Sequence, residues 1–155
     1  MPSPLRRSNR RERLSLRTVG LRIYATAAYA REMATILVAE DDAGVRDLVL
    51  AALGRVGHTV VTVRNGEEAI RVLEEKDPAI DLLVSDINMP GLGGIELVSM
   101  ARDRAGSLPV LMMSGTNRWA FKPETIAADI RVLEKPFTLH QLLDAVEVAL
   151  AETRR

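Results

Sequence analysis

The chain of 155 residues contains no cysteine, and only 3% of its residues are aromatic. The absence of cysteine excludes a disulfide framework and any metal site built on thiolates. Because aromatic side chains are so scarce, valine, leucine, isoleucine and alanine must fill the interior, and a hydrophobic fraction of 47% is enough for one core. No run approaches the roughly 18 apolar residues that a membrane-spanning helix needs. We therefore expect one folded domain with no membrane span.

The chain also has no excess of positive or negative charge, because its formal net charge is zero. The charges are nevertheless unevenly distributed along the sequence. Residues 1–33 hold eight arginines and two glutamates, whereas the rest of the chain holds 13 of the 21 basic and 19 of the 21 acidic side chains. An acidic body disfavours general nucleic-acid binding. We interpret residues 1–33 as a basic N-terminal extension, disordered or partly helical, ahead of a domain at residues 34–152. An export signal, an anion-binding arm and absence from the mature protein remain open alternatives for the extension.

From residue 34 onward, β-type apolar runs alternate with segments of helical periodicity, which is typical of βαβ units. Right-handed crossovers then predict a doubly wound α/β fold, with helices on both faces of a five-stranded parallel sheet. Periodicity places Leu48 and Leu139 on the buried faces of their helices. Pro123 forbids one continuous helix after the fourth strand, so we expect a loop and a short helix there. The predicted strands are residues 35–39, 58–63, 81–85, 109–113 and 130–133. The five predicted helices are residues 43–56, 66–75 and 95–104, the short fourth helix near Pro123, and residues 138–152.

Polar residues stand where four of these strands end. In an open parallel sheet, ligands bind in the crevice outside the carboxyl ends of the strands, so we expect these residues to meet at one site. Taken singly, each has an ordinary explanation, such as the acidic helix N-cap that we expect of Asp42. The residues are Glu40, Asp41 and Asp42 after the first strand, Asp86 after the third, Ser114 after the fourth and Lys135 after the fifth.

Asp86 is the candidate phosphoryl acceptor, because a carboxylate at a strand end is a positioned nucleophile that needs no deprotonation near neutral pH. Its negative charge, together with those of Glu40 and Asp41, would repel a phosphoryl group. A hard divalent cation, Mg²⁺ or Mn²⁺, would relieve that repulsion and suits oxygen ligands. We expect Asp41 and Asp86 to ligate it directly, Glu40 to act through water, and Asn88 to offer its backbone carbonyl.

Ser114 and Lys135 are expected to supply fixed hydrogen-bond donors to the phosphoryl oxygens, which a metal ion cannot provide. The charge of a transferring phosphoryl group spreads over three oxygens, and fixed donors aimed at those oxygens stabilise it. Lys135 offers a positive charge and Ser114 a hydroxyl donor, although in isolation they would be a surface lysine and an ordinary strand-end serine. The peptide bond between Lys135 and Pro136 is also a candidate for the cis form.

Four segments together resemble the receiver domain of two-component response regulators, the CheY-like fold. They are ILVAEDD at 36–42, LLVSDINMPGLGGIEL at 82–97, LMMSG at 111–115 and VLEKPF at 132–137. The resemblance implies strand order 2-1-3-4-5, a cytoplasmic location and Mg²⁺-dependent phosphoryl transfer to Asp86 from a sensor histidine kinase or phosphotransfer protein. The domain would then hydrolyse its own acyl phosphate, without acting as an enzyme on a separate substrate.

The resemblance also implies a switch, in which Ser114 follows the phosphoryl group and reshapes the face formed by the fourth helix, fifth strand and fifth helix. A downstream protein partner would bind that face. The chain departs from many receivers by carrying Val132 where a tyrosine or phenylalanine is common, so the aromatic part of the switch is missing. Asn88 and Thr116 would flank the path of the hydrolytic water and partly set the phosphoryl lifetime.

The sequence ends soon after the fifth predicted helix, from which we expect a stand-alone receiver with no DNA-binding domain that signals through protein contacts. One alternative is a degenerate receiver that binds partners but is never phosphorylated. A phosphohydrolase with an aspartyl-phosphate intermediate is another, and a nucleic-acid binder that uses the basic extension is a third. The cognate kinase, the output partner, the sign of regulation and the oligomeric state stay open.

Overall fold

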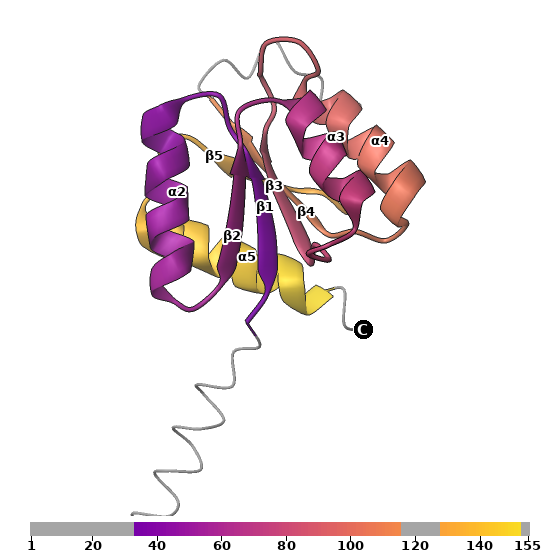
Figure 1. Cartoon of the computed structure of the whole chain (residues 1–155). Coiled ribbons are helices and arrows are strands. Elements are labelled where there is room, and N and C mark those ends of the chain that lie inside the picture. The colour runs from indigo at the N-terminus through magenta and orange to yellow at the C-terminus, as the bar shows by residue number, and fades with distance from the viewer. Residues whose placement is uncertain (1–32, 116–127, 153–155) are drawn as a thin grey trace, which may run out of the picture. The chain divides into compact units, whose positions relative to one another are not determined.

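A computed structural model describes residues 33–115 and 128–152 of the chain. Its centre is a five-stranded sheet in which all pairings are parallel and the order is β2-β1-β3-β4-β5 (Figure 1). This confirms the predicted fold class and strand order, with each strand within about two residues of its predicted bounds. The strands are β1 (Thr35–Ala39), β2 (Thr59–Val63), β3 (Leu82–Asp86), β4 (Val110–Ser114) and β5 (Arg131–Glu134).

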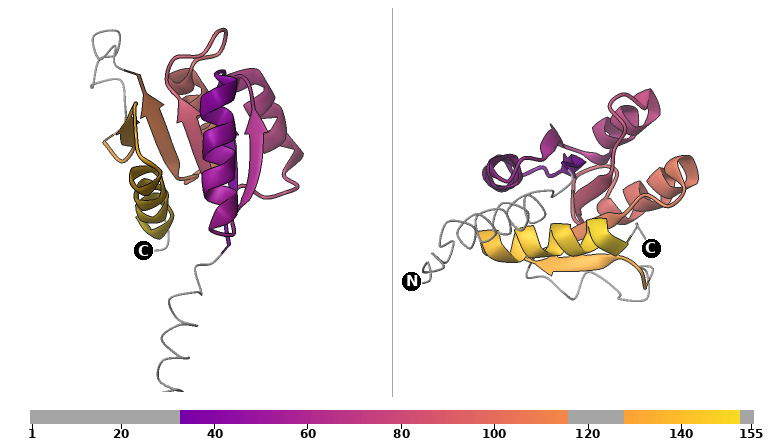
Figure 2. Two further views of the ribbon diagram at one scale, coloured as in Figure 1. Left: turned by 90° about the vertical axis from the view of Figure 1, so that its left-hand side faces the viewer. Right: turned by 90° about the horizontal axis from the view of Figure 1, so that it is seen from below.

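Four helices are present in the described part of the chain, and they cover both faces of the sheet. Two of them, α2 and α5, pack on one face, whereas α3 and α4 pack on the other (Figures 1 and 2). Among the described residues, no helix is long and apolar enough to cross a bilayer. The short helix expected near Pro123 lies outside the described residues. The helices are α2 (Ala43–Arg55), α3 (Gly66–Glu75), α4 (Gly94–Ala105) and α5 (Leu139–Glu152).

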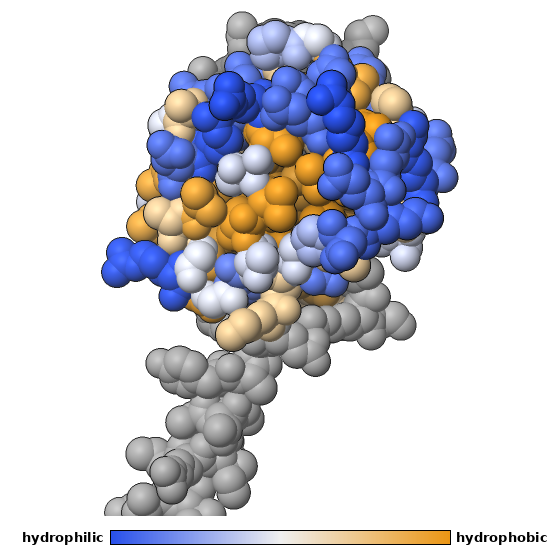
Figure 3. Space-filling model, viewed as in Figure 1, coloured by the Kyte–Doolittle hydropathy of each residue, from blue (hydrophilic) through white to orange (hydrophobic). Residues whose placement is uncertain are grey.

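Alternation along the strands divides the core into two layers. In β1, Leu37 and Ala39 join the cluster under α3 and α4, whereas Ile36 and Val38 join the cluster under α2 and α5. Successive side chains of a strand point to opposite faces, so a strand covered on both sides must be apolar throughout. At the sheet edge, β2 is only partly buried, and hydrophobic side chains are visible between α2 and α3 in Figure 3. The two layers hold the central strands in fixed positions, and the ends of those strands carry the polar residues.

Side-chain caps start the helices that follow the strands. Asp42 accepts a hydrogen bond from the backbone N–H of Val45 at 2.9 Å, as we expected for the N-cap of α2. Asn65 caps α3 in the same way through the N–H of Glu68, at 2.8 Å. Such a cap satisfies a backbone donor that the first helical turn leaves free. Because Asp42 serves α2, the two acidic residues before it remain available at the end of β1.

The predicted burial of two helix positions is wrong. Leu48 and Leu139 are 43% and 46% exposed, respectively. The face of α2 that meets the sheet is centred on Val49 and Leu53, and Leu48 is turned from Val49 by about 100° around the helix axis. Leu139 is the first residue of α5, where the helix has only begun to cover the sheet. Both leucines therefore add apolar surface to the molecule.

The loop between β3 and α4 approaches the end of β3 so closely that Gly94 has no room for a side chain. A Cβ atom built on Gly94 would lie 2.2 Å from the backbone oxygen of Asp86. The N–H of Gly94 donates to the carbonyl of Ile87 at 2.9 Å and closes this turn. A glycine here therefore fixes the path of the backbone directly after Asp86.

We expect Gly94→Ala to lower the free energy of unfolding by about 1–3 kcal/mol, because the backbone at Asp86 must shift to admit a methyl group. The matched control is Gly54→Ala in α2, where a Cβ atom meets nothing within 4 Å. That change should raise the free energy of unfolding by about 0.5–1 kcal/mol. Urea denaturation of the three proteins measures both effects, and a Gly94→Ala protein as stable as wild type would contradict the close approach.

Candidate functional site

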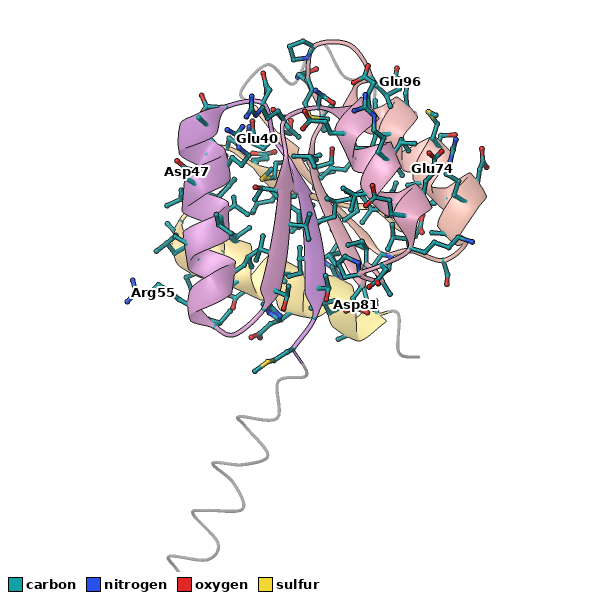
Figure 4. All side chains as sticks on the ribbon, in the orientation of Figure 1. Glu40, Asp47, Arg55, Glu74, Asp81 and Glu96 are labelled. Carbon is teal, nitrogen blue, oxygen red and sulfur yellow. The ribbon has the colours of Figure 1, made fainter. Side chains whose placement is uncertain are left out.

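The carboxyl ends of the strands bring polar residues from distant parts of the sequence together. Glu40 and Asp41 directly follow β1, and Asp86 is the last residue of β3. Lys135 follows β5 and reaches across the sheet end to Glu40 and Asp86. Figure 4 labels Glu40 at this end of the sheet, whereas Asp81 lies at the opposite end. The predicted convergence at one edge of the sheet is therefore present.

Three carboxylates form a compact acidic cluster. Glu40, Asp41 and Asp86 each offer an oxygen within 4.8 Å of the others. Glu40 has no solvent exposure and Asp86 is only 6% exposed, whereas Asp41 faces solvent. A set of hard oxygen donors with one open side matches what a divalent cation such as Mg²⁺ requires, since Mg²⁺ keeps several waters and takes few protein ligands. The residues present at the cluster therefore fit such an ion.

Lys135 places a positive charge against two members of the cluster. Its Nζ atom lies 2.8 Å from Glu40 Oε2 and 3.2 Å from Asp86 Oδ2. Burial disfavours the charged form of this lysine, but the hydrogen bond to Glu40 and the charges of Asp86 and Glu40 outweigh burial and raise the pKa of Lys135. The ammonium group thus stays charged at neutral pH and offsets part of the repulsion among the carboxylates.

Glu40 is the buried member of the cluster, and protein donors engage both of its carboxylate oxygens. The N–H of Asp42 donates to Oε1 at 3.0 Å, and Lys135 donates to Oε2. Burial raises the pKa of Glu40, while the hydrogen bonds from Lys135 and from the N–H of Asp42 act in the opposite direction. The nearby charge of Asp86 raises the pKa of Glu40 further. The hydrogen bond from Lys135 therefore favours the ionised form of Glu40 against the effect of burial.

The loop after β3 surrounds Asp86 with backbone donors and acceptors. The N–H of Asn88 donates to Asp86 Oδ1 at 3.3 Å, and the hydroxyl of Ser85 donates to the backbone carbonyl of Asp86 at 2.9 Å. The other carboxylate oxygen, Oδ2, faces Lys135. Asn88 itself is exposed in this loop. The ligand role predicted for its backbone carbonyl stays a prediction.

The remaining predicted residues differ in how they relate to this cluster. Ser114 ends β4 and is 6% exposed, but its hydroxyl donates to the carbonyl of Gly115 at 3.2 Å. Val132 lies on the edge strand β5 and is 41% exposed. The peptide bond between Lys135 and Pro136 is cis, as the sequence suggested. Thr116 lies outside the described residues.

Two features near the cluster were not predicted from the sequence. Arg46 in the first turn of α2 hydrogen-bonds the backbone carbonyls of Glu40 and Asp41. No periodic pattern in the sequence signals this contact, because it depends on how α2 docks and on the rotamer of Arg46. An apolar hollow of about 360 Å³ also opens beside Lys135. It is lined by Val45, Leu48, Gly115, Lys135, Pro136 and Phe137.

Comparison with known sequences agrees with this geometry. A family model described as the response regulator receiver domain matches residues 36–147. The response regulator receiver protein CpdR of Brucella abortus is 36% identical over 119 residues, which are 76% of this chain and 98% of that protein. The response regulator FleR of Pseudomonas aeruginosa is 38% identical over 116 residues, 73% of this chain but only 24% of FleR. The two-component response regulator PhoP of that organism is 34% identical, over 69% of this chain and 47% of PhoP.

Solved structures show the same relationship. A response regulator receiver protein from Sinorhizobium medicae aligns with a TM-score of 0.68 at 33% identity, covering 77% of this chain and 96% of that one. The receiver domain of the hybrid histidine kinase CckA aligns with a TM-score of 0.64 at 32% identity, over 75% of this chain and 98% of that domain. Sequence, strand order and the acidic cluster therefore agree, and the chain belongs to the response regulator receiver domain family.

Proposed function

We propose that this chain accepts a phosphoryl group on Asp86 from a sensor histidine kinase or a phosphotransfer protein, in a reaction that depends on Mg²⁺. The observation that carries the proposal is the position of the Asp86 carboxylate. It lies within a cluster of acidic oxygens on one side and faces the ammonium group of Lys135 on the other. The signal then leaves through protein contacts, and the chain turns over no substrate apart from its own acyl phosphate.

The acidic cluster defines which residues would hold the metal ion. Asp41 is exposed and Asp86 borders it, so both can ligate directly. Glu40 is buried and already accepts two hydrogen bonds, which suits a role through a bound water. Asn88 follows in the same loop and can contribute its backbone carbonyl. A divalent ion bound at these residues would offset the carboxylate charges and act as a Lewis acid toward the phosphoryl group.

The chemistry that we propose for Asp86 is a direct displacement. A carboxylate oxygen of Asp86 attacks the phosphorus of a phosphohistidine, the P–N bond breaks, and its electron pair returns to the imidazole, which takes up a proton. The ammonium group of Lys135 stabilises negative charge on the transferring oxygens. Ser114 supplies a further donor once its hydroxyl turns away from the carbonyl of Gly115. Because Val132 occupies the position where many receivers carry a tyrosine or phenylalanine, we expect no aromatic rotation at that position to accompany the movement of Ser114.

The surface suggests where two kinds of protein partner bind. The apolar hollow bordered by Leu48 and Phe137 lies directly beside Lys135, so a kinase domain seated there would bring its phosphohistidine close to Asp86. Contiguous apolar patches on a protein surface often mark contact sites. On β5 and α5, the exposed side chains of Val132 and Val148 contribute to the face that we assign to the downstream partner.

Labelling with acetyl phosphate tests the acceptor. We expect the wild-type protein to gain one phosphoryl group in the presence of Mg²⁺ and Asp86→Asn to gain none, as measured by intact mass. Asp47→Asn, an exposed change on α2, is the control and should label normally. An unlabelled wild-type protein would favour a degenerate receiver. Sustained turnover of a small phosphoester that survives Asp86→Asn would favour a phosphohydrolase.

We expect Lys135→Met to destabilise the metal-free protein by about 1–3 kcal/mol near neutral pH, because buried carboxylate acceptors lose their charged donor. The pKa of Glu40 is raised above its ordinary value of 4.5, so the stability that Glu40 contributes is complete below that value and declines as the pH rises through its folded pKa. Loss of Lys135 raises the folded pKa of Glu40 further. The difference from wild type should therefore shrink at acid pH.

Urea denaturation at about pH 7.5 and about pH 4 measures this effect, since a glutamate titrates between those values. Arg55→Met, which removes an exposed cation at the end of α2, is the control and should change stability little at either pH. A loss for Lys135→Met that is equal at both pH values would show that Glu40 does not depend on this lysine.

The lifetime of the acyl phosphate is expected to depend on Asn88 and Thr116. Replacing both by alanine should change the rate of dephosphorylation several-fold, because these side chains would flank the approach of water to Asp86. The affinity for Mg²⁺ should change little, since only the backbone of Asn88 would ligate. Decay of the labelled protein after removal of acetyl phosphate gives the rate, and an unchanged rate would remove both residues from this role.

A further inference from the structure

Arg46 has no part in the function proposed above, yet it lies against the backbone of two cluster residues. Its Nη1 atom donates to the carbonyl oxygen of Glu40 at 2.9 Å and lies 3.3 Å from the carbonyl oxygen of Asp41. The side chain projects from the first turn of α2, and the residue is only partly exposed. One guanidinium group thus joins α2 to the two successive peptide groups that follow β1.

Several contacts fix the turn between β1 and α2 besides those of Arg46, including the bonds from the N–H of Asp42 to Glu40 Oε1 and from the N–H of Val45 to Asp42 Oδ1. The N–H of Glu40 donates to the carbonyl of Val63, and the carbonyl of Asp42 accepts from the N–H of Arg46 as the first bond of the helix. The two carbonyls between these points, on Glu40 and Asp41, are the acceptors that the guanidinium engages. Without it, the carbonyl of Glu40 loses the side-chain hydrogen bond that ties this peptide group to α2.

The backbone of Glu40 and Asp41 carries two of the three carboxylates of the cluster. A shift of this backbone segment would move the exposed side chain of Asp41 relative to Asp86 and strain the bond between the N–H of Asp42 and Glu40 Oε1. In the observed arrangement the three carboxylates bring their oxygens within 4.8 Å of each other. We propose that Arg46 is a positioning residue that holds Glu40 and Asp41 in the geometry required for divalent-cation binding. This inference deepens the proposed function and rests on it.

The charge of Arg46 and its hydrogen bonds have opposite effects on a cation. A positive charge beside the cluster repels a divalent ion, so removal of the charge alone would strengthen binding. Loss of the two carbonyl contacts would weaken binding, because the ligands would no longer be held in place. Groups that orient metal ligands typically change the affinity by about 10–100-fold when they are removed. The sign of the effect therefore distinguishes the two roles.

The test compares Arg46→Gln and Arg46→Lys with Arg55→Gln, which removes the same charge from the other end of α2. The probe is Mn²⁺ alone, titrated into the unphosphorylated full chain and followed by electron paramagnetic resonance. We expect Arg46→Gln to weaken Mn²⁺ binding about tenfold. Arg46→Lys should also bind more weakly than wild type, because an ammonium group is a strongly hydrated point charge on a flexible stem and does not hold the two carbonyls as the planar guanidinium does. Arg55→Gln should bind as wild type does.

Amide hydrogen exchange of the metal-free proteins gives a second readout. Exchange at the N–H of Asp42 should accelerate in both Arg46 variants, while exchange in the centre of α2 should stay as in wild type. Equal or tighter Mn²⁺ binding by Arg46→Gln would overturn the proposal. If Arg46→Gln does not fold, Arg46→Lys decides the matter, and wild-type affinity together with wild-type exchange at Asp42 would overturn it.

These measurements also separate the inference from the proposed function. If Asp86 takes up no phosphoryl group but Mn²⁺ binding still depends on Arg46, the proposed function fails and the positioning role stands. If Asp86 is labelled normally and Mn²⁺ binding is unaffected by Arg46→Gln, the positioning role fails alone.

Discussion

The contact of Lys135 with Glu40 and Asp86 is the interaction on which the rest of the site depends. Three carboxylates gather at the end of the sheet, and one of them is fully buried, so the arrangement would be strongly unfavourable without a compensating charge. The ammonium group lies within 3.2 Å of two carboxylates and holds both in one geometry. Lys135 follows β5 but contacts residues at the ends of β1 and β3, so the site forms only when these strands are in place.

The parallel sheet brings the like charges together, and its packing also holds them in place. Parallel strands all end at the same edge, so residues that are distant in sequence are forced together there. Apolar side chains on both faces of β1 and β3 fix those strand ends, and the tight turn at Gly94 fixes the backbone after Asp86. A loosely packed scaffold would let like charges move apart. A rigid one keeps them close enough to bind a cation.

The features that could be predicted from the sequence are those set by local pattern and by topology. The alternation of apolar runs with helical segments predicts the positions of the strands and the helix cap at Asp42. The parallel arrangement of the strands predicts that their ends converge. The exposure of Leu48, the hydroxyl direction of Ser114 and the carbonyl contacts of Arg46 could not be predicted in this way. They depend on the angle at which α2 docks and on the choice of rotamer, and neither leaves a periodic signal in the sequence.

The two cations at this site act on different parts of the chain, and this difference has a chemical consequence. Lys135 contacts carboxylate oxygens and so reduces the negative charge that a metal ion would meet. Arg46 is bound to backbone carbonyls, so its hydrogen bonds leave the carboxylate lone pairs of Asp41 and Asp86 available. A second lysine-like contact to the carboxylates would leave only one of the three negative charges uncompensated, and it would compete with a divalent ion for their oxygens. Because Arg46 donates to backbone carbonyls instead, it can order the cluster without occupying those oxygens.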